Sequence, residues 1–222
     1  MTPSGGGGRT VNLALSALFA ALTAIFAQVK FNLGPVPYTM QNFAIMTAAL
    51  LLRPKYAALS QLLYLLLIGF SLPAGAGLRG GPGVLVGYTA GYLWMFPITS
   101  YLMSRLSRMR LGRSMEGLVH LSAKELACLL ALSFIAALPM YLLGFLVFSY
   151  YALQPTLTGR GLAAWVDRVT RCLGTAPLGR WFGLFTASVL IFIPQDLFVD
   201  HLLAIVIASK VLRFTKNLGL PS

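Results

Sequence analysis

The sequence predicts an all-α membrane protein, built as a bundle of six transmembrane helices with both termini in the cytoplasm. The first observation is composition: 58% of the 222 residues are hydrophobic, 10% are charged, and the mean hydropathy is +0.80. That much apolar surface exceeds what the core of one water-soluble domain can bury. The second observation is that the apolar residues fall into blocks of helical length. The third is that the basic residues lie between these blocks.

The apolar blocks account for the predicted spans in chain order. A helix needs about 20 apolar residues to cross a hydrocarbon core of roughly 30 Å. The block 39–52 is shorter than this, which we interpret as a tilted or partly irregular element. The stretch 181–193 is also apolar, but Pro194 ends it, so we predict a re-entrant or surface helix there that leads into the last span. The six predicted spans are residues 11–29, 39–52, 56–72, 84–103, 126–150 and 195–213.

The chain is predicted to contain one domain between two tails. Residues 1–10, which include a run of glycines, are predicted to be a flexible tail. Residues 11–213 form the six-helix transmembrane domain, and residues 214–222 form a cytoplasmic tail. The connection 151–182 allows two interpretations, an amphipathic helix at the membrane surface or a solvated loop. The helical interpretation rests on the spacing of Leu162, Trp165, Val166 and Val169.

The formal net charge of +12 indicates membrane topology. The Lys and Arg residues flank apolar blocks and do not form a basic stripe with interleaved aromatics, so we expect no nucleic-acid partner. With a cytoplasmic amino terminus, most of them fall on the cytoplasmic side, including Lys210, Arg213 and Lys216. Seven crossings would put that cluster outside. We therefore expect a multi-pass protein of the cell (inner) membrane, in contact with membrane lipid.

Motifs of catalysis are missing from the sequence. There is no Gly-Lys dipeptide and hence no Walker A loop, so any ATP-driven step needs another subunit. There is also no HExxH and no GxSxG motif. Cys128 and Cys172 do not have the spacing of a zinc site. We therefore predict that the chain is not an enzyme and uses no cofactor and no metal.

Asp196 is the most informative ionisable residue, because it follows Pro194 at the start of the last predicted span. An acid in the first turn of a helix can simply stabilise the helix dipole. An ionisable group at membrane depth usually faces a cavity, so we favour a role in binding a small solute. Asp200 lies one turn deeper on the same face. It is either a second binding residue or a structural partner of a basic residue.

The run from Ser71 to Tyr92 is rich in glycine, so its backbone can fold closely over a small ligand. Its one charge, Arg79, is either an anchor for a substrate carboxylate or a contact to lipid headgroups. Gly87 and Gly91 are candidates for the site, although close helix packing is the more common role of such glycines. Among the nearby aromatics we select Tyr92 as a binding candidate.

Small residues in the first predicted span form a smooth strip that another helix can approach closely. Packing within the chain and contact with a partner protein both fit this strip. Its members include Ala17, Ala20, Ala21 and Ala24.

Three motifs in chain order carry a resemblance to a known family. They are Leu33-Gly34-Pro35-Val36-Pro37-Tyr38-Thr39-Met40-Gln41, Gly87-Tyr88-Thr89-Ala90-Gly91-Tyr92-Leu93 and Pro194-Gln195-Asp196-Leu197. In these segments the sequence resembles the BioY family, the biotin-specific S components of energy-coupling factor (ECF) transporters. The resemblance extends from about residue 11 to residue 213, and the stretch 104–182 matches it only in general character.

The resemblance implies a six-helix bundle of the ECF S-component type that captures biotin from outside. It also implies three partner subunits, a membrane-embedded T component and two cytoplasmic ATPases. Asp196 stands at the family's PxD aspartate, where a carboxylate accepts hydrogen bonds from the ureido N–H groups of biotin. The proline-rich loop then brings Tyr38, Thr39 and Gln41 to the same rim. The alanine strip matches the family's AxxxA surface for the T component.

The sequence departs from the family pattern at Val199, where a lysine is common, and at Asp200, where a small residue is common. How the carboxylate of biotin is held is therefore open, with Arg79 our first choice and Lys30 our second. The departure at Val199 keeps an S component for another vitamin, riboflavin or thiamine, as an alternative. A less favoured alternative is a membrane-embedded enzyme with Asp196 and Asp200 as an acid/base pair.

Overall fold

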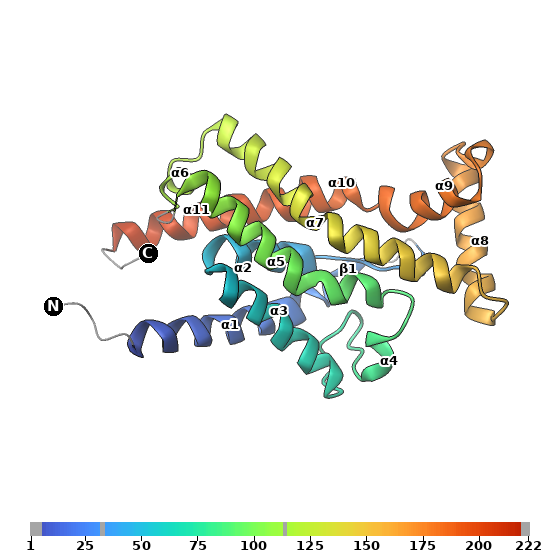
Figure 1. The fold of residues 1–222 in the computed structure, drawn as a ribbon, viewed down its shortest axis with the longest axis horizontal. Coiled ribbons are helices and arrows are strands. Elements are labelled where there is room, and N and C mark those ends of the chain that lie inside the picture. The colour runs from blue at the N-terminus through green and yellow to red at the C-terminus, as the bar shows by residue number, and fades with distance from the viewer. Residues whose placement is uncertain (1–5, 32–33, 113–114, 219–222) are drawn as a thin grey trace.

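The computed structural model describes residues 6–31, 34–112 and 115–218. These residues form an elongated bundle of helices with one short hairpin (Figure 1). The two strands, β1 (Lys30–Phe31) and β2 (Tyr38–Thr39), pair antiparallel. In chain order the helices are α1 (Gly6–Phe26), α2 (Gln41–Leu51), α3 (Pro54–Gly69), α4 (Pro82–Leu85), α5 (Ala90–Leu111), α6 (Glu116–Val119), α7 (Ala123–Ala152), α8 (Leu157–Cys172), η1 (Ala176–Leu178), α9 (Arg180–Phe185), η2 (Thr186–Leu190), α10 (Ile193–Gln195), η3 (Asp196–His201) and α11 (Leu202–Asn217).

Helix α1 satisfies its own polar side chains, as a segment inside a bilayer must. The Ser16 hydroxyl donates to the carbonyl of Asn12 at 2.9 Å, and the Thr23 hydroxyl donates to the carbonyl of Phe19 at 2.8 Å. The Ser16 hydroxyl also lies 3.1 Å from the carbonyl oxygen of Tyr56, which connects α1 to α3. The helix begins at Gly6, so the second half of the predicted flexible tail 1–10 is helical.

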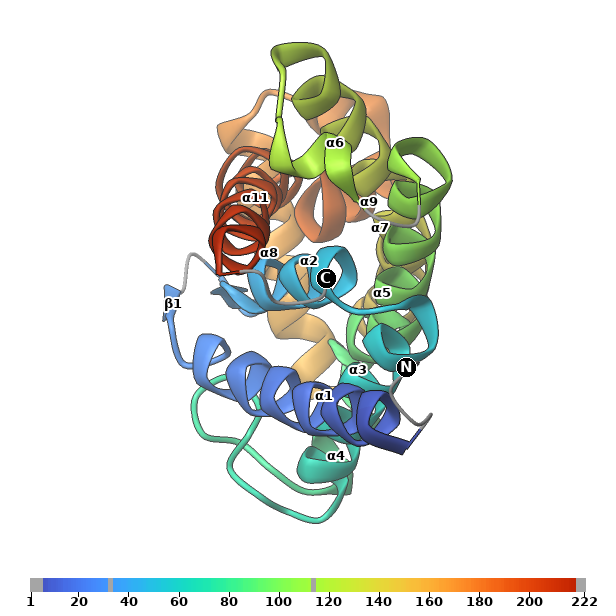
Figure 2. The ribbon, with the colours of Figure 1, turned by 90° about the vertical axis from the view of Figure 1, so that its left-hand side faces the viewer.

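Helix α2 confirms that the apolar block 39–52 forms a short element, and the surroundings of this helix explain why it can be short. It has 11 residues, and every residue from Phe43 to Leu50 is buried. Figure 2 shows α2 in the middle of the bundle, where it packs against α1, α5, α11 and η3. A helix enclosed by protein on all sides has no need to reach both lipid boundaries itself.

The stretch 181–193 is helical and leads into the last predicted span, but Pro194 does not end it, which corrects that part of the prediction. Residues Arg180–Asn217 form one 38-residue helical run. Pro194 lies in the first turn of α10, where the missing N–H of proline is tolerated. The π-helical segments η2 and η3 flank it, and they let the run continue past the proline. The amide of Asp196 still donates to the carbonyl of Phe192 at 3.0 Å.

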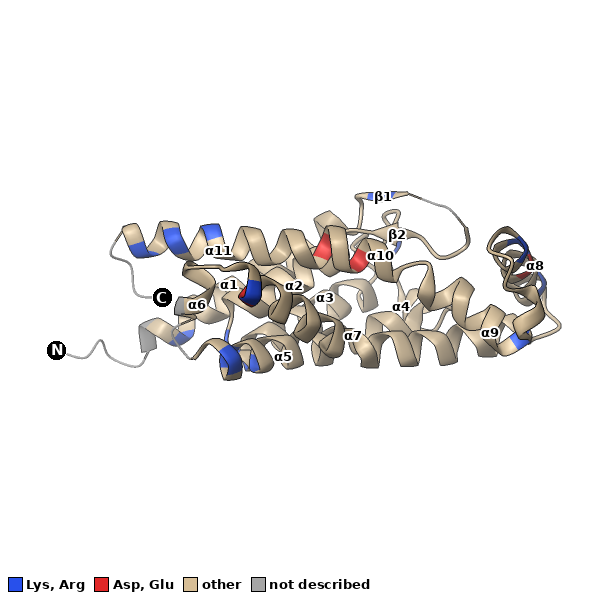
Figure 3. Ribbon diagram, turned by 90° about the horizontal axis from the view of Figure 1, so that it is seen from above, with Lys and Arg blue, Asp and Glu red and all other residues tan. Residues whose placement is uncertain are grey.

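Among the described residues, three helical runs are long and apolar enough to cross a membrane: Gly8–Phe26, Ala123–Ala152 and Arg180–Asn217. Figure 1 shows that α1 begins and α11 ends at the same end of the bundle. Figure 3 shows Lys and Arg residues near both ends of the long axis of the bundle, with acidic residues near α10.

The outward face of α7 is apolar and exposed, as a surface in contact with lipid is. Its exposed side chains include Ile135, Leu138, Leu142 and Leu146.

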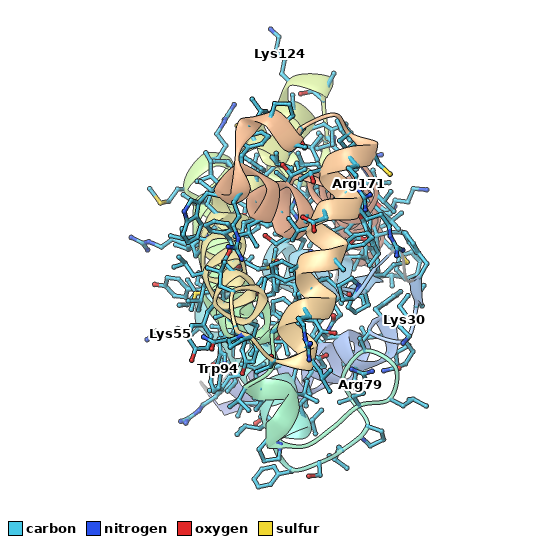
Figure 4. The ribbon with its side chains drawn as sticks, turned by 90° about the vertical axis from the view of Figure 1, so that its right-hand side faces the viewer. Lys30, Lys55, Arg79, Trp94, Lys124 and Arg171 are labelled. Atoms are coloured by element: carbon cyan, nitrogen blue, oxygen red, sulfur yellow. The ribbon has the colours of Figure 1, made fainter. Side chains whose placement is uncertain are left out.

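The connection 151–182 contains helix α8, so the helical interpretation of this connection is correct and the loop interpretation is wrong. It is an amphipathic helix, and the Thr156 side chain caps it by accepting from the amide of Gly159 at 3.0 Å. Its apolar face packs on protein, in a cluster with the neighbouring helices and with Val36. The buried side chains on this face are Leu162, Val166 and Val169. Figure 4 shows α8 crossing one end of the bundle.

Candidate ligand-binding site

A cavity of about 730 Å³ opens near the end of the bundle that α8 crosses. Five segments line it: the hairpin with the start of α2, the glycine-rich segment 75–89, the first turns of α5, the middle of α7 and the residues around Pro194. The volume lies within the range of about 300–1,000 Å³ typical of sites for small molecules. The cavity therefore draws its walls from parts of the chain that are far apart in sequence.

The carboxylate of Asp196 is fixed at the wall of this cavity by two donors. Its side chain is 5% exposed. Asn42 Nδ2 donates to Asp196 Oδ1 at 2.8 Å, and Tyr141 Oη donates to Asp196 Oδ2 at 2.7 Å. Each carboxylate oxygen can accept more than one hydrogen bond. Asp196 is thus held in place by the protein and still able to accept from a ligand.

Two further acceptors beside Asp196 have no donor within the described part of the chain. These are the buried side-chain oxygens Asn42 Oδ1 and Gln195 Oε1, and both residues line the cavity. The Asn42 amide cannot be reversed, because its oxygen would then face the Asp196 carboxylate. Gln195 Nε2 donates to the carbonyl of Thr39 at 3.3 Å. A buried acceptor without a donor is unfavourable, and both oxygens stand beside the Asp196 carboxylate, so this part of the wall is rich in acceptors.

Aromatic side chains form the apolar part of the cavity wall. The ring of Tyr38 stacks on Phe192 with centroids 4.3 Å apart, and on Phe31 at 5.0 Å. The Tyr38 hydroxyl donates to the carbonyl of Ile191 at 2.9 Å. Burial, with a smaller contribution from the charge of Asp196, raises the pKa of Tyr38 to about 12. The phenol therefore stays a neutral donor at physiological pH.

Thr39 and Gln41 belong to a chain of hydrogen bonds that shapes the base of the hairpin. The Thr39 hydroxyl donates to Gln41 Oε1 at 2.8 Å, and Gln41 Nε2 donates to the hydroxyl of Tyr64. The Tyr64 hydroxyl in turn donates to the carbonyl of Ala74 at 3.3 Å. This chain ties the hairpin, which borders the cavity, to α3 and to Ala74, directly before the glycine-rich segment 75–89.

Lys30 and Arg79 supply positive charge to the cavity lining. In Figure 4 both residues lie on the same side of α8. The backbone of Arg79 is held by the amide of Gly75, which donates to its carbonyl at 2.8 Å. Among the described residues neither side chain forms an ion pair. The two cations are therefore free to bind an anionic group of a ligand.

The structure brings most of the predicted site residues together. Asp196, Arg79, Tyr38, Thr39, Gln41, Tyr92 and Gly87 all line the cavity. Gly91 does not, because it lies where α5 crosses α7, and a Cβ there would be 2.3 Å from the carbonyl oxygen of Leu143. Asp200 is also outside the lining, fully buried, with its Oδ2 3.5 Å from Gln195 Nε2. An acid/base pair with Asp196 thus lacks its second group in the cavity.

The sequence analysis missed three residues of this site: Asn42, Tyr141 and Gln195. Gln195 lies inside the motif Pro194-Gln195-Asp196-Leu197, and Asn42 directly follows the motif that ends at Gln41, so selecting every polar residue in and beside the motifs would have included both. Tyr141 lies inside the apolar span of α7, where a tyrosine differs little from other aromatic residues by pattern alone.

The alanine strip of α1 divides between the core and the surface. Ala20 is 2% exposed and packs in the main hydrophobic core, and Ala24 is partly buried against it. Ala17 and Ala21 are exposed. Only these two therefore offer a surface to another protein in this arrangement.

Comparisons with known proteins agree on one family. The family model for the BioY family matches residues 2–217. A probable biotin transporter BioY of Pyrococcus horikoshii is 42% identical over 90 residues, which cover 40% of this chain and 56% of that protein. The biotin transporter BioY of Thermotoga maritima is 38% identical over 92 residues, covering 41% and 54%. The chain thus aligns with about half the length of these curated relatives.

A solved structure supports the fold. The S-component for biotin from an ECF-type ABC transporter superimposes with a TM-score of 0.65 at 18% sequence identity. The superposition covers 96% of this chain and 95% of that one. Because the family match extends over nearly the whole chain and the described helices include apolar runs of membrane-spanning length, this is a membrane protein, and it belongs to the BioY family.

Proposed function

We propose that this chain is the substrate-binding S component of an ECF transporter and that it captures biotin from outside the cell. The observation that carries this proposal is the buried wall of acceptors formed by Asp196, Asn42 and Gln195. The relatives named as biotin transporters support the choice of ligand.

The chemistry of biotin fits this wall. Its ureido ring carries two N–H donors in a fixed arrangement, which need acceptors once water is removed. The Asp196 carboxylate accepts one or both in a charge-assisted hydrogen bond, and Asn42 Oδ1 and Gln195 Oε1 lie beside it. The stacked rings of Tyr38 and Phe192 provide an apolar surface for the rest of the bicycle.

The carboxylate of biotin requires a cation, because burying an unpaired charge is costly. Arg79 is our first choice and Lys30 our second, and both line the cavity. Their side chains have no ion-pair partner among the described residues. This assignment explains how a family member with Val199 in place of a lysine can still hold an anionic ligand.

The topology that we propose has six membrane crossings and both termini in the cytoplasm of the cell (inner) membrane. It is supported by the common end at which α1 begins and α11 ends, and by the basic residues of α11 at that end. The cavity then opens to the outside. The exposed Ala17 and Ala21 on α1 face the membrane-embedded T component, which couples the chain to two ATPase subunits.

Ligand identification tests this function. The protein is purified in detergent without added vitamin, and any retained small molecule is identified by mass spectrometry; radiolabelled biotin is then bound to ligand-free protein. We expect retention of unchanged biotin and saturable binding. Binding of riboflavin or thiamine in place of biotin would overturn the substrate, and a chemically altered ligand would overturn the role as a binding subunit.

A further inference from the structure

The part of the cavity that reaches the molecular surface is bordered by positive charge. Most residues of the lining are buried or half-buried, and a cavity meets the surface where its lining is exposed. The exposed residues of the lining are Lys30, Arg79, Gly80 and Gly83. Two of these carry a cation, so this part of the surface faces water or headgroups and not the apolar core of the membrane.

Further arginine side chains cover the outward face of α8 and the start of α9. The apolar face of α8 packs on protein, and the opposite face carries the exposed Arg160, Arg168 and Arg171. Arg180 is also exposed and is the first residue of α9, which packs against α8. We call these four residues the arginine surface. Figure 4 looks onto this end of the bundle, with α8 across it and Arg171 labelled.

The middle of α8 lies against the cavity lining. Gly34 lines the cavity, and a Cβ at that position would lie 2.6 Å from ring atoms of Trp165 on α8. Arg160 and Arg171 stand five and six residues from Trp165, on either side of it, which is about 8 and 9 Å along the helix axis. The Debye length is about 30 Å at 0.01 M salt. The arginine surface is therefore within electrostatic reach of a ligand that approaches the cavity.

The charge of the arginine surface is poorly offset by acids. Among the described residues, Asp167 is the one exposed acid on α8 and α9, and no arginine of this surface forms an ion pair. Arg171 Nε instead donates to the backbone carbonyl of Asp167 at 3.1 Å. The Asp196 carboxylate stands in the cavity wall, so an anionic ligand approaches a group of its own charge. Cations outside the cavity offset that repulsion.

Lipid headgroups are the other anions that such a surface could meet. A helix that lies on a membrane buries its apolar face in the bilayer. The apolar face of α8 is instead occupied by protein, through Leu162, Val166 and Val169. Because α8 crosses the end of the bundle, its opposite face turns away from the long helices (Figure 4). The arginines on that face are therefore presented to water, which favours a soluble anion as their partner.

We propose that the arginine surface attracts the anionic ligand from water and speeds its entry into the cavity, whereas Arg79 or Lys30 holds the carboxylate after entry. The proposal rests on the proposed function, with biotin as the ligand. The arginines lie outside the cavity lining, so they should raise the association rate and leave the dissociation rate nearly unchanged. Their effect should weaken with ionic strength, since salt screens exposed charges.

Binding kinetics at several salt concentrations test the arginine surface. The variant combines Arg160→Gln, Arg168→Gln and Arg171→Gln, and association and dissociation of radiolabelled biotin are timed by rapid filtration. We expect the variant to associate roughly three- to tenfold more slowly at about 0.01 M salt and at the wild-type rate at about 1 M, where the Debye length is about 3 Å. Arg180→Gln, with a smaller expected slowing, covers the case in which the triple variant does not fold.

Two controls isolate the effect of charge. The neutral amide of biotin should associate with the wild type and the variant at equal rates and without dependence on salt. A second triple variant, Arg110→Gln, Lys210→Gln and Lys216→Gln, removes three exposed cations at the other end of the bundle. It should associate with biotin at the wild-type rate.

Quenching of tryptophan fluorescence measures the same field without biotin. The three tryptophans of the chain are Trp94 in the first turns of α5, Trp165 in α8 and Trp181 in α9. A positive surface concentrates iodide around them. We expect the α8 variant to lower the quenching constant of iodide and to leave that of the neutral quencher acrylamide unchanged.

The outcomes separate this proposal from the proposed function. If biotin binds to the wild type, and the α8 variant keeps the same association rate and salt dependence, the arginine surface has no role and the proposed function stands. The kinetics are repeated in nanodiscs of neutral phosphatidylcholine, with and without anionic phosphatidylglycerol. An effect of the arginines that vanishes on adding the anionic lipid would assign them to headgroups and overturn the proposal. If the wild type binds no biotin but iodide quenching depends on the arginines, the proposed ligand is wrong and the anion-attracting surface is supported.

Discussion

Asn42 and Asp196 are joined by a hydrogen bond of 2.8 Å between the first turn of α2 and the π-helical segment η3. The residues are 154 positions apart in the chain. The bond directs Asn42 Nδ2 at Asp196 Oδ1 and leaves Asn42 Oδ1 buried, without a donor among the described residues. Asn42 thus orients the Asp196 carboxylate by donating to it from Nδ2.

Asp196→Asn should weaken biotin binding by about 1 to 3 kcal/mol, because a charge-assisted acceptor is replaced by a neutral amide. The protein should remain folded, since the side chain keeps its volume. Equilibrium binding of radiolabelled biotin measures the change, and size-exclusion chromatography checks folding. Asp200→Asn is the matched control, because Asp200 is buried outside the cavity lining and its loss should leave affinity nearly unchanged. Equal effects of the two substitutions would contradict the assignment.

Tyr141→Phe should weaken biotin binding by about 1 kcal/mol. The hydroxyl that donates to Asp196 Oδ2 at 2.7 Å is lost, so the carboxylate is no longer held from the side of α7. Isothermal titration calorimetry of the purified protein measures the effect. Tyr150→Phe on the same helix is the control, because that side chain is 63% exposed. An unchanged affinity in Tyr141→Phe would show that α7 does not orient Asp196.

Arg79→Ala should reduce affinity for biotin by about 1.5 to 3 kcal/mol and leave affinity for the neutral amide of biotin almost unchanged. The reason is that only the acid form carries the anionic group that the guanidinium pairs with. Competition binding with both ligands measures the difference. Lys30→Ala serves as the comparison, and a larger loss there than in Arg79→Ala would assign the carboxylate to Lys30.

Gly91→Ala should destabilise the fold by about 1 to 3 kcal/mol without a direct effect on the cavity. Its added Cβ would lie 2.3 Å from the backbone oxygen of Leu143, so α5 and α7 must move apart. Thermal unfolding in detergent, followed by tryptophan fluorescence, measures the change. Gly8→Ala is the control, because a Cβ at that position meets no atom within 4 Å. Equal melting temperatures of the two variants would be inconsistent with this packing.

Ala21→Trp should block assembly with the T component while biotin binding by the isolated chain persists. Ala21 is exposed on the α1 strip, and a large side chain there keeps another helix at a distance. Co-purification with the T component and the ATPases measures assembly. Leu142→Trp, on the exposed face of α7, is the control. If Ala21→Trp assembles as well as that control, the partner surface lies elsewhere.

Much of the site was predictable because its residues cluster in short motifs. Asp196, Tyr38, Thr39 and Gln41 stand in segments whose polar and proline residues are unusual at membrane depth, and the cavity does collect them. Tyr141 was not predictable, since hydropathy records that α7 is apolar but not which of its faces turns inward. For Gly91 the sequence favoured close helix packing over ligand contact, and the structure shows such packing, but the pattern could not tell that α7 is the helix it packs against.

The helix that continues past Pro194 shows a second limit of prediction from sequence. Pro194 is a strong signal to end a helix, and the prediction for 181–193 followed it. The backbone continues because two π-helical segments rearrange the hydrogen bonds around the proline, and local sequence patterns carry no clear sign of such turns. The spacing of apolar residues in α8, by contrast, supported the helical one of the two interpretations of 151–182, and the helix is present, with these residues packed on protein.

The enclosed position of α2 has a consequence for how the protein is made. Its 11 residues rise only about 16 Å, roughly half of a hydrocarbon core of about 30 Å. Such a segment cannot settle across a bilayer on its own as the nascent chain emerges. It can be enclosed only between helices synthesised before and after it, including α11 at the other end of the chain. The cavity-lining residues at the start of α2 therefore reach their final depth in the membrane only when synthesis is nearly finished.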